Sequence, residues 1–327
     1  CQELRALVAP LQAQNQELQS ECQKLRGRMR ALEGELEEGG RRQRQRVGPA
    51  PHDAPPSDAE VAVMGLAEAV AALRAHVAVA RVAKKAFMRL HDLSFPEGSE
   101  QAAAEAGAIE EVVAALRAHP QMAGVQEWGC GVLANMCFGD DAAASARCQR
   151  AAAAGALEAV VAAMRAHLLV AGVQEQACRA LINVCAGDDA AGLARSQRAA
   201  EAGALEEVVA ALRAHPQMAF VQKHGCCALA NMCSGDDAVA AARKQRAAAA
   251  GAIEAVVAAM REEEMQKDGC RALHSFCSGG AGVRARRQRA AQAGARTVVV
   301  AAMQAHPDHG EVQRIRQMVL GFLPVEV

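Results

Sequence analysis

The sequence predicts an all-α solenoid, in which stacked copies of one helical unit share a continuous core. The first observation is repetition: the segment from Gly107 to His119 (GAIEEVVAALRAH) returns nearly unchanged from Gly155, Gly203 and Gly251. The second is that its apolar residues recur three and four positions apart, which is the spacing of one helix face. Repetition at a fixed period of this length is typical of stacked supersecondary units. We therefore expect function to lie on a shared surface.

The length of the repeat follows from the residue that ends this segment's helical stretch. Aligning the copies on it gives spacings of 43, 48, 48, 48 and 43 residues between Arg74, Arg117, Arg165, Arg213, Arg261 and Gln304. The first and last copies diverge most, as expected of end units that face water on one side. The predicted repeat domain covers residues 57–327 in six units, with approximate bounds 57–94, 95–137, 138–185, 186–233, 234–277 and 278–327.

Each unit contains three predicted helices. The first runs through residues 109–116 and is ended by His119 and Pro120. The second covers residues 125–137, where apolar side chains again recur at helical spacing before Gly139 ends the helix. Aspartates then cap a third, Ala-rich helix that leads into the next copy, and the Gly-Asp-Asp sequence recurs at 187–189 and 235–237.

Three helices in a repeat of about 42–48 residues point to an armadillo or HEAT solenoid. The pattern Gly-Ala-(Ile/Leu)-Glu-x-Val-Val-Ala-Ala, followed by Val-Gln-x-x-x-Cys-x-x-Leu-x-Asn, resembles the armadillo repeat family from about Ser57 to Leu323. The resemblance implies a right-handed superhelix of about six three-helix repeats. It also implies a concave groove lined by the last helix of each repeat, on which a partner would lie.

A different pattern precedes the repeats. Leucines recur every seven residues from Leu4, with apolar residues at alternate positions, which predicts a coiled-coil helix over residues 1–38. An Asn in the apolar seam favours a two-stranded parallel dimer, whose predicted contacts are Leu11, Asn15, Leu18, Leu25 and Leu32. Residues 39–56 are rich in Gly, Pro and Arg and predict a flexible linker. Its arginine cluster is either a solvated flank or an anionic docking patch or localisation signal.

The candidate binding residues are short hydrogen-bonding side chains at one place in the second helix of successive units. They are Asp92, Asn135, Asn183, Asn231 and Ser275. Such residues disfavour helix interiors, so their recurrence needs a reason. By resemblance to the armadillo family, these positions would line the groove and hold the backbone of an extended peptide. The alternative is that they only tie one helix to the next.

One turn earlier, the matching positions hold Met88, Gly131, Arg179, Cys227 and Arg271. Importin-alpha-type members of the family carry a Trp there, which sandwiches the stems of basic peptide side chains, so its absence argues against capture of a basic segment. Arg179 and Arg271 instead suit an acidic or mixed ligand. The only tryptophan, Trp128, is a further candidate partner contact.

Other recurring residues receive structural interpretations. The cysteines seven apart in each second helix lie about 10 Å from each other along the axis, too far to share one zinc ion, so we interpret them as core. The histidines His76, His119, His167, His215 and His306 are interpreted as caps of the first helix. The arginines of the third helices predict either a solvated face balanced by the nearby Asp pairs or a phosphate-contacting stripe: Arg147, Arg195, Arg243, Arg286, Arg150, Arg198, Arg246 and Arg289.

Net charge, apolar run length and the motifs present limit the classes of function that the sequence favours. The formal net charge of -1 gives no global attraction to nucleic acid or membranes, and no apolar run reaches the roughly 20 residues that span a bilayer. We find no phosphate loop, nucleophile elbow or dinucleotide fingerprint, and expect no enzyme, cofactor or metal. The sequence predicts a cytoplasmic scaffold for a protein partner, with the nucleus left open. Because the chain begins at Cys1, the runner-up is a regulatory or cargo-binding region of a larger motor, ubiquitin ligase or kinase.

Overall fold

The computed structural model describes residues 54–94, 98–305 and 310–323, and the chain from Pro55 to Val327 forms one compact unit. Every regular element in these ranges is a helix, so the prediction of an all-α chain is confirmed for them. The predicted coiled coil and the linker as far as residue 53 lie outside the described residues.

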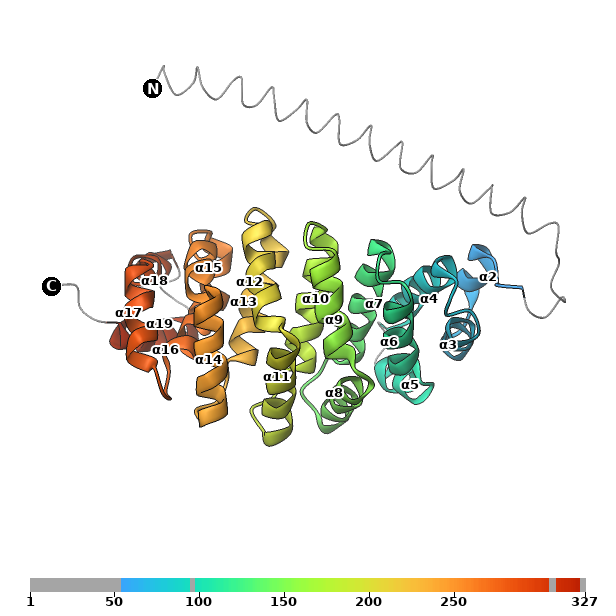
Figure 1. Cartoon of the computed structure of the whole chain (residues 1–327), viewed down its shortest axis with the longest axis horizontal. Coiled ribbons are helices and arrows are strands. Elements are labelled where there is room, and N and C mark those ends of the chain that lie inside the picture. The colour runs from blue at the N-terminus through green and yellow to red at the C-terminus, as the bar shows by residue number, and fades with distance from the viewer. Residues whose placement is uncertain (1–53, 95–97, 306–309, 324–327) are drawn as a thin grey trace, which may run out of the picture. The chain divides into compact units, whose positions relative to one another are not determined.

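Three helices come from each complete copy of the repeat, and α2 (Asp58–Val63) precedes them (Figure 1). The first helices are α3 (Leu66–Ala75), α6 (Ala108–Ala118), α9 (Ala156–Ala166), α12 (Ala204–Ala214), α15 (Ala252–Ala259) and α18 (Ala295–Ala305). The second helices are α4 (Ala80–Leu93), α7 (Ala123–Met136), α10 (Ala171–Val184), α13 (Ala219–Met232), α16 (Gln266–Cys277) and α19 (Gly310–Phe322). The third helices are α5 (Ser99–Glu105), α8 (Ala142–Ala154), α11 (Ala190–Ala202), α14 (Ala238–Ala250) and α17 (Val283–Gln292).

Like helices of successive units pack on one another. The second helices form an unbroken series of contacts from α4 through α7, α10, α13 and α16 to α19. The first helices α3 to α15 and the third helices α5 to α14 form parallel series, so the chain builds a row of units in sequence order (Figure 1). This arrangement is compatible with an α-solenoid.

The core is aliphatic and continuous along the row. In α6 the side chains of Ile109, Val112 and Leu116 are fully buried, and they pack with Val125 and Leu133 of α7 in a hydrophobic cluster shared by all the described units. Ala residues between them let the helices approach closely. The burial therefore follows the three-and-four spacing read from the sequence.

The joints between units also follow the sequence pattern. The side chain of Asp141 accepts a hydrogen bond of 2.6 Å from the backbone N–H of Ala144, and Asp189 and Asp237 cap their helices in the same way. At the other end of α8, Gly155 has φ +86°, a left-handed conformation that favours glycine. A Cβ there would also lie 2.0 Å from Nη2 of Arg117.

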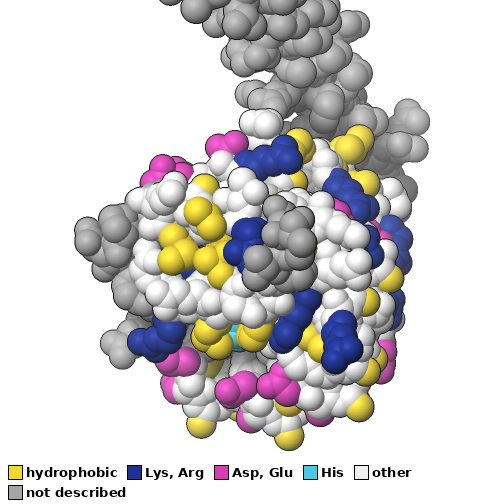
Figure 2. All heavy atoms as spheres, turned by 90° about the vertical axis from the view of Figure 1, so that its left-hand side faces the viewer, with side chains coloured by type: hydrophobic (Ala, Val, Ile, Leu, Met, Phe, Trp, Pro, Cys, Tyr) yellow, Lys and Arg dark blue, Asp and Glu magenta, His cyan; other side chains and the backbone are white. Residues whose placement is uncertain are grey.

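The units nearest the C-terminus depart from the common pattern. Helix α15 ends early at Ala259, and a 3₁₀ turn at Glu263–Met265 joins it to α16. On the end of the row, side chains of α18 and α19 leave apolar surface exposed, with Val300 38% and Met318 42% exposed; Figure 2 faces this end. Within the described residues, none of the helices has the length and apolarity needed to cross a membrane.

Candidate functional site

The arginine series of the third helices divides into two sets with different roles. The first set is buried, with Arg147, Arg195, Arg243 and Arg286 between 1% and 8% exposed. In each case the guanidinium donates to carbonyls at the end of the preceding second helix. Arg243, for example, donates to Met232 O at 2.8 Å and to Ser234 O at 2.9 Å. The interpretation of these four as part of a solvated or phosphate-contacting stripe was therefore wrong, because the helix ends need buried donors.

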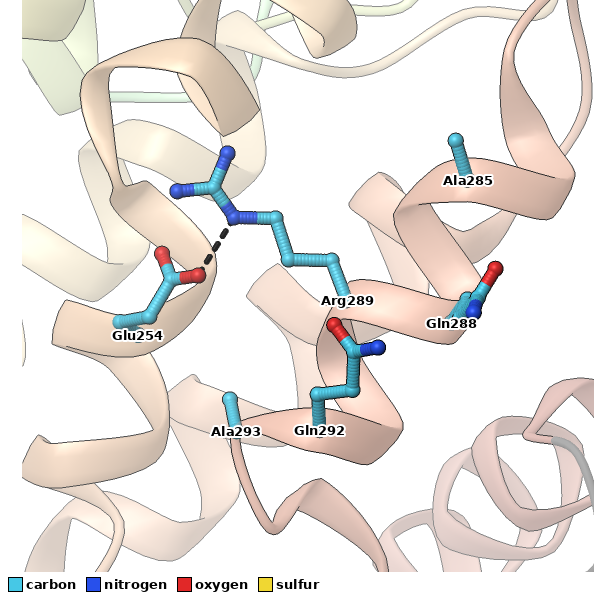
Figure 3. A pocket seen from close by; sticks show the side chains of 6 residues that line it. All are labelled: Glu254, Ala285, Gln288, Arg289, Gln292 and Ala293. Carbon is cyan, nitrogen blue, oxygen red and sulfur yellow. Dashed lines mark hydrogen bonds and ion pairs between the residues drawn. The ribbon is translucent and has the colours of Figure 1, made fainter.

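The second set of arginines is half-exposed and paired with acids of the preceding first helix. Arg150 meets Glu110 at 2.6 Å, and Arg198 meets Glu158 at 2.7 Å. The same pairing recurs at Arg246 with Glu206 and at Arg289 with Glu254; Figure 3 shows the last pair in an open depression of the outer surface. This set is charge-balanced as predicted, but by glutamates of the first helices rather than by the Asp pairs, and the ion pairs leave little positive charge for phosphate.

A third ion-pair series depends on a residue that alternates between copies. Arg165 pairs with Glu207 at 2.8 Å in the next unit. For Arg117, the position of the next unit that corresponds to Glu207 holds Ala159. Arg117 therefore donates to Gly155 O instead, at 3.3 Å. Small differences between near-identical copies thus change which acceptor an arginine uses.

Three histidines occupy the C-cap position of their own first helix, as predicted, but their imidazoles contact the preceding unit instead of that helix end: His119, His167 and His215. Nε2 of His119 lies 2.6 Å from Val77 O, and Nε2 of His215 lies 2.7 Å from Leu168 O, in each case a carbonyl in the loop of the preceding unit. His306 lies outside the described residues. A buried glutamine meets the carbonyls at the helix end. Gln126 donates to Leu116 O at 2.9 Å and to His119 O at 2.8 Å.

The cysteines lie in the core, as predicted. Nine of the ten described cysteines are buried and Cys227 is half-buried. Burial raises the pKa of Cys130, Cys178, Cys185 and Cys233 to about 12, so these thiols stay protonated near neutral pH. No group of three or more potential metal ligands comes together among the described residues.

The predicted site residues of the second helices lie in one register and contact the neighbouring unit. Nδ2 of Asn183 donates to Ala134 O at 2.7 Å, and Nδ2 of Asn231 donates to Ile182 O at 3.0 Å. Asn135 donates to Oγ of Ser94 at 2.9 Å. Each asparagine is half-buried. The ties between helices, the alternative left open by the sequence, are therefore present.

The Oδ1 atoms of these asparagines have different hydrogen-bond donors from unit to unit. Nη2 of Arg179 donates to Oδ1 of Asn135 at 3.1 Å, and Nη2 of Arg271 reaches Oδ1 of Asn231 at 3.5 Å. The matching position of α13 is Cys227, which carries no guanidinium. Among the described residues, no donor lies at hydrogen-bonding distance from Oδ1 of Asn183.

The outer members of the series differ from the three asparagines. Asp92 is exposed, and its carboxylate lies 3.8 Å from Nδ1 of His91. Oγ of Ser275 donates to Ala230 O at 3.3 Å, so it repeats the helix tie with a shorter side chain. Trp128 is half-buried on α7, edge-on to the His91 ring at a centroid distance of 5.3 Å.

Charged side chains on the second helices are distributed unevenly along the row. The register of Glu127 and Glu175 continues as Lys223 and Lys267 in the next two units. Burial raises the pKa of Glu175, and the nearby Glu127 carboxylate adds to the rise while the Arg179 guanidinium opposes it. We call the half-buried and exposed side chains of α7, α10, α13 and α16 in these registers the second-helix face. Its acids lie toward α7 and its cations toward α16.

No protein-family model matches the chain, and no curated protein matches it. The arrangement therefore has to be interpreted from its own residues. Sequence reasoning missed the buried Gln126 series and the capping role of the Arg147 series. The glutamine recurs at one register of the second helices from α7 to α19, and the arginine at one register of the third helices from α8 to α17. That recurrence beside a helix end was a usable sign of capping.

Proposed function

We propose that residues 57–327 form an armadillo-type solenoid that binds an extended segment of a partner protein on the second-helix face, without catalysis. The resemblance of the repeat sequence to that family supports the fold, together with three helices per unit and like helices packed in series. In the armadillo family the last helix of each repeat lines the concave groove, so the resemblance would make the second-helix face the concave side.

The observation that carries the proposal is the recurrence of a half-buried amide at one register of three successive second helices. An Asn side chain has two N–H donors and an oxygen with two lone pairs. In each of Asn135, Asn183 and Asn231, one N–H of the amide donates to an acceptor on or at the end of the preceding second helix. That bond fixes the amide and leaves a second N–H and at least one lone pair, which are the groups that a peptide C=O and N–H require.

The helix tie and the peptide contact are therefore compatible. A tied amide loses little side-chain entropy when a ligand arrives, since its rotamer is already held. Neighbouring second helices lie about 10 Å apart, so amides on successive units meet an extended chain at about every third residue. If the predicted coiled coil pairs two chains, two such faces would act together and raise avidity.

The test begins with selection of peptide ligands for the full chain from a displayed random library. Binding of a selected peptide is then measured by fluorescence anisotropy for a variant with Asn135, Asn183 and Asn231 changed to Ala. The matched control changes three amides on the successive third helices α8, α11 and α14, Gln149, Gln197 and Gln245, to Ala. Circular dichroism checks that both variants are folded.

The proposal predicts that the asparagine variant binds at least about 100-fold more weakly, because each of the three units loses two hydrogen bonds to the peptide worth about 0.5–1.5 kcal/mol each. The glutamine variant should bind within about twofold of the parent chain. Equal affinities for the two folded variants would show that the ligand lies elsewhere, and the groove mechanism would be abandoned.

A further inference from the structure

Two arginines of the second-helix face are not paired with a glutamate, unlike the half-exposed arginines of the third helices. Arg150, Arg198 and Arg246 each pair with a glutamate at 2.6–2.7 Å. Arg179 donates instead to Oε1 of Gln176 at 2.6 Å and to the amide of Asn135, and Arg271 contacts the amide of Asn231. Within the described residues, neither has a carboxylate at ion-pair distance. Their charge is thus available for an anion from outside the chain.

The spacing of the two arginines sets the length of extended peptide that can reach both. They occupy the same register of α10 and α16, which are two units apart in the row. With second helices about 10 Å apart, the two guanidinium groups lie about 20 Å apart along the row. An extended peptide advances about 3.3 Å per residue, so it would bring side chains six residues apart to the two arginines.

A side-chain amide that can bond to a peptide backbone lies between the two guanidinium groups, because Arg179 reaches Asn135 on α7 and Arg271 reaches Asn231 on α13. Asn183 is on α10, one turn beyond Arg179, and its Oδ1 has no arginine partner because Cys227 occupies the matching place on α13. Asn135 and Asn231 each have an arginine on Oδ1. Asn183 is therefore the amide of the series that is best able to accept a bond from a peptide N–H.

The other charges on this stretch favour an anion. Lys223 of α13 and Lys267 of α16 are exposed on the same face, which gives four cations with the two arginines. The facing acids are Glu127 of α7, whose carboxylate lies against Gly172 of α10, Glu175, whose pKa burial raises, and Asp268, which is 8% exposed. Four cations against these three carboxylates leave a net positive strip from α10 to α16, with its acids toward α7.

We infer that the bound segment is acidic, with two carboxylate side chains about six residues apart. One carboxylate pairs with Arg179 and the other with Arg271, while the backbone between them bonds to Asn183. This inference rests on the proposed function and adds the chemistry of the ligand to it. Bonds between a guanidinium and a carboxylate are charge-assisted and often bidentate, which accounts for arginine at both ends.

The experiment is selection from a displayed library of random peptides on the full chain, followed by sequencing of the enriched peptides. The expected result is enrichment of Asp or Glu pairs five to seven residues apart. Binding of a synthetic enriched peptide should weaken about 10-fold in Arg179→Gln and in Arg271→Gln, and more steeply in low salt. Arg198→Gln and Arg246→Gln remove arginines outside the face and should change affinity less than twofold.

A variant that adds a cation to the face gives a second readout, which does not depend on losing a contact. Cys227→Arg places a guanidinium on α13, so cations stand on three successive units about 10 Å apart. The inference predicts that this variant also enriches peptides with acids about three residues apart. Unchanged spacing in the selected peptides would contradict the assignment of these positions.

The outcomes separate the inference from the proposed function. Enriched peptides without acidic pairs, whose binding is still lost in the triple asparagine variant, would overturn the inference and leave the groove mechanism standing. Acidic peptides that need the two arginines but bind the triple asparagine variant at full affinity would overturn the groove mechanism, since charge alone would then hold the ligand. Failure to enrich any peptide would contradict both.

Discussion

Replacing Arg243 by Met removes the guanidinium that caps the second helix α13. This side chain is 3% exposed, and it donates to Met232 O at 2.8 Å, to Ser234 O at 2.9 Å and to Oε1 of Gln197 at 3.4 Å. Met fills a similar volume but donates no hydrogen bond, so the two carbonyls lose their donors. The perturbation therefore isolates capping from packing.

The magnitude follows from the two short bonds. A hydrogen bond to a charged group is worth about 1.5–3 kcal/mol, and part of that gain is offset because the folded chain no longer buries a charge. We expect a loss of about 2–4 kcal/mol in the free energy of unfolding. For a domain of this size the thermal midpoint, followed by far-UV circular dichroism, should fall by roughly 5–10 °C.

The matched control lies one turn along the same helix. Arg246 pairs with Glu206 at 2.6 Å, but the two side chains are 43% and 41% exposed. Exposed ion pairs are worth about 0–1 kcal/mol, so Arg246→Met should move the midpoint by no more than about 2 °C. If the two variants melt together, the buried arginine series does not hold the second helices in place and the capping argument is refuted.

Three further predictions follow from single observations. Gly155→Ala and Gly98→Ala should each destabilise the chain by the roughly 1–2 kcal/mol of a left-handed alanine in chemical denaturation, because the Cβ at 155 meets only the movable end of the Arg117 side chain and the Cβ at 98 meets nothing; a much larger loss at 155 would contradict this. Arg316→Leu should raise the thermal midpoint, since the guanidinium is fully buried and, among the described residues, has only the weakly accepting Cys270 thiol beside it; a lower midpoint would contradict this. Burial raises the pKa of four core thiols in the folded chain to about 12. The free energy of unfolding should therefore keep their full contribution below pH 9 and fall from there toward pH 12 by about 1.4 kcal/mol per thiol per pH unit. A free energy of unfolding that does not change over this range would refute the prediction.

The helices could be predicted from the sequence because each copy carries the same local signs. Apolar residues at three-and-four spacing gave the buried faces of α6 and α7, and Asp141 before an Ala-rich stretch gave the start of α8. These features act within one unit, where spacing along the chain translates directly into contact. Repetition then showed that the same contacts recur.

Contacts between elements were harder to predict. An arginine in an Ala-rich helix is usually exposed. Arg147 is buried because it donates to the free carbonyl of Met136, which lies eleven residues earlier at the end of another helix. His119 likewise reaches a carbonyl of the preceding unit. The candidate asparagines were placed correctly on the second helices, but the sequence could not tell a helix tie from a ligand contact, since one amide can make both.

The most direct test of the central claim is the location of a bound peptide. A photoreactive benzoylphenylalanine is placed at Lys223, which is exposed on the second-helix face, or at Ala242, which is exposed on the third helix α14. Each protein is irradiated with a peptide selected on the parent chain, and adducts are quantified by mass spectrometry. Binding on the second-helix face predicts an adduct at position 223 and little at position 242. An adduct confined to position 242 would contradict the account.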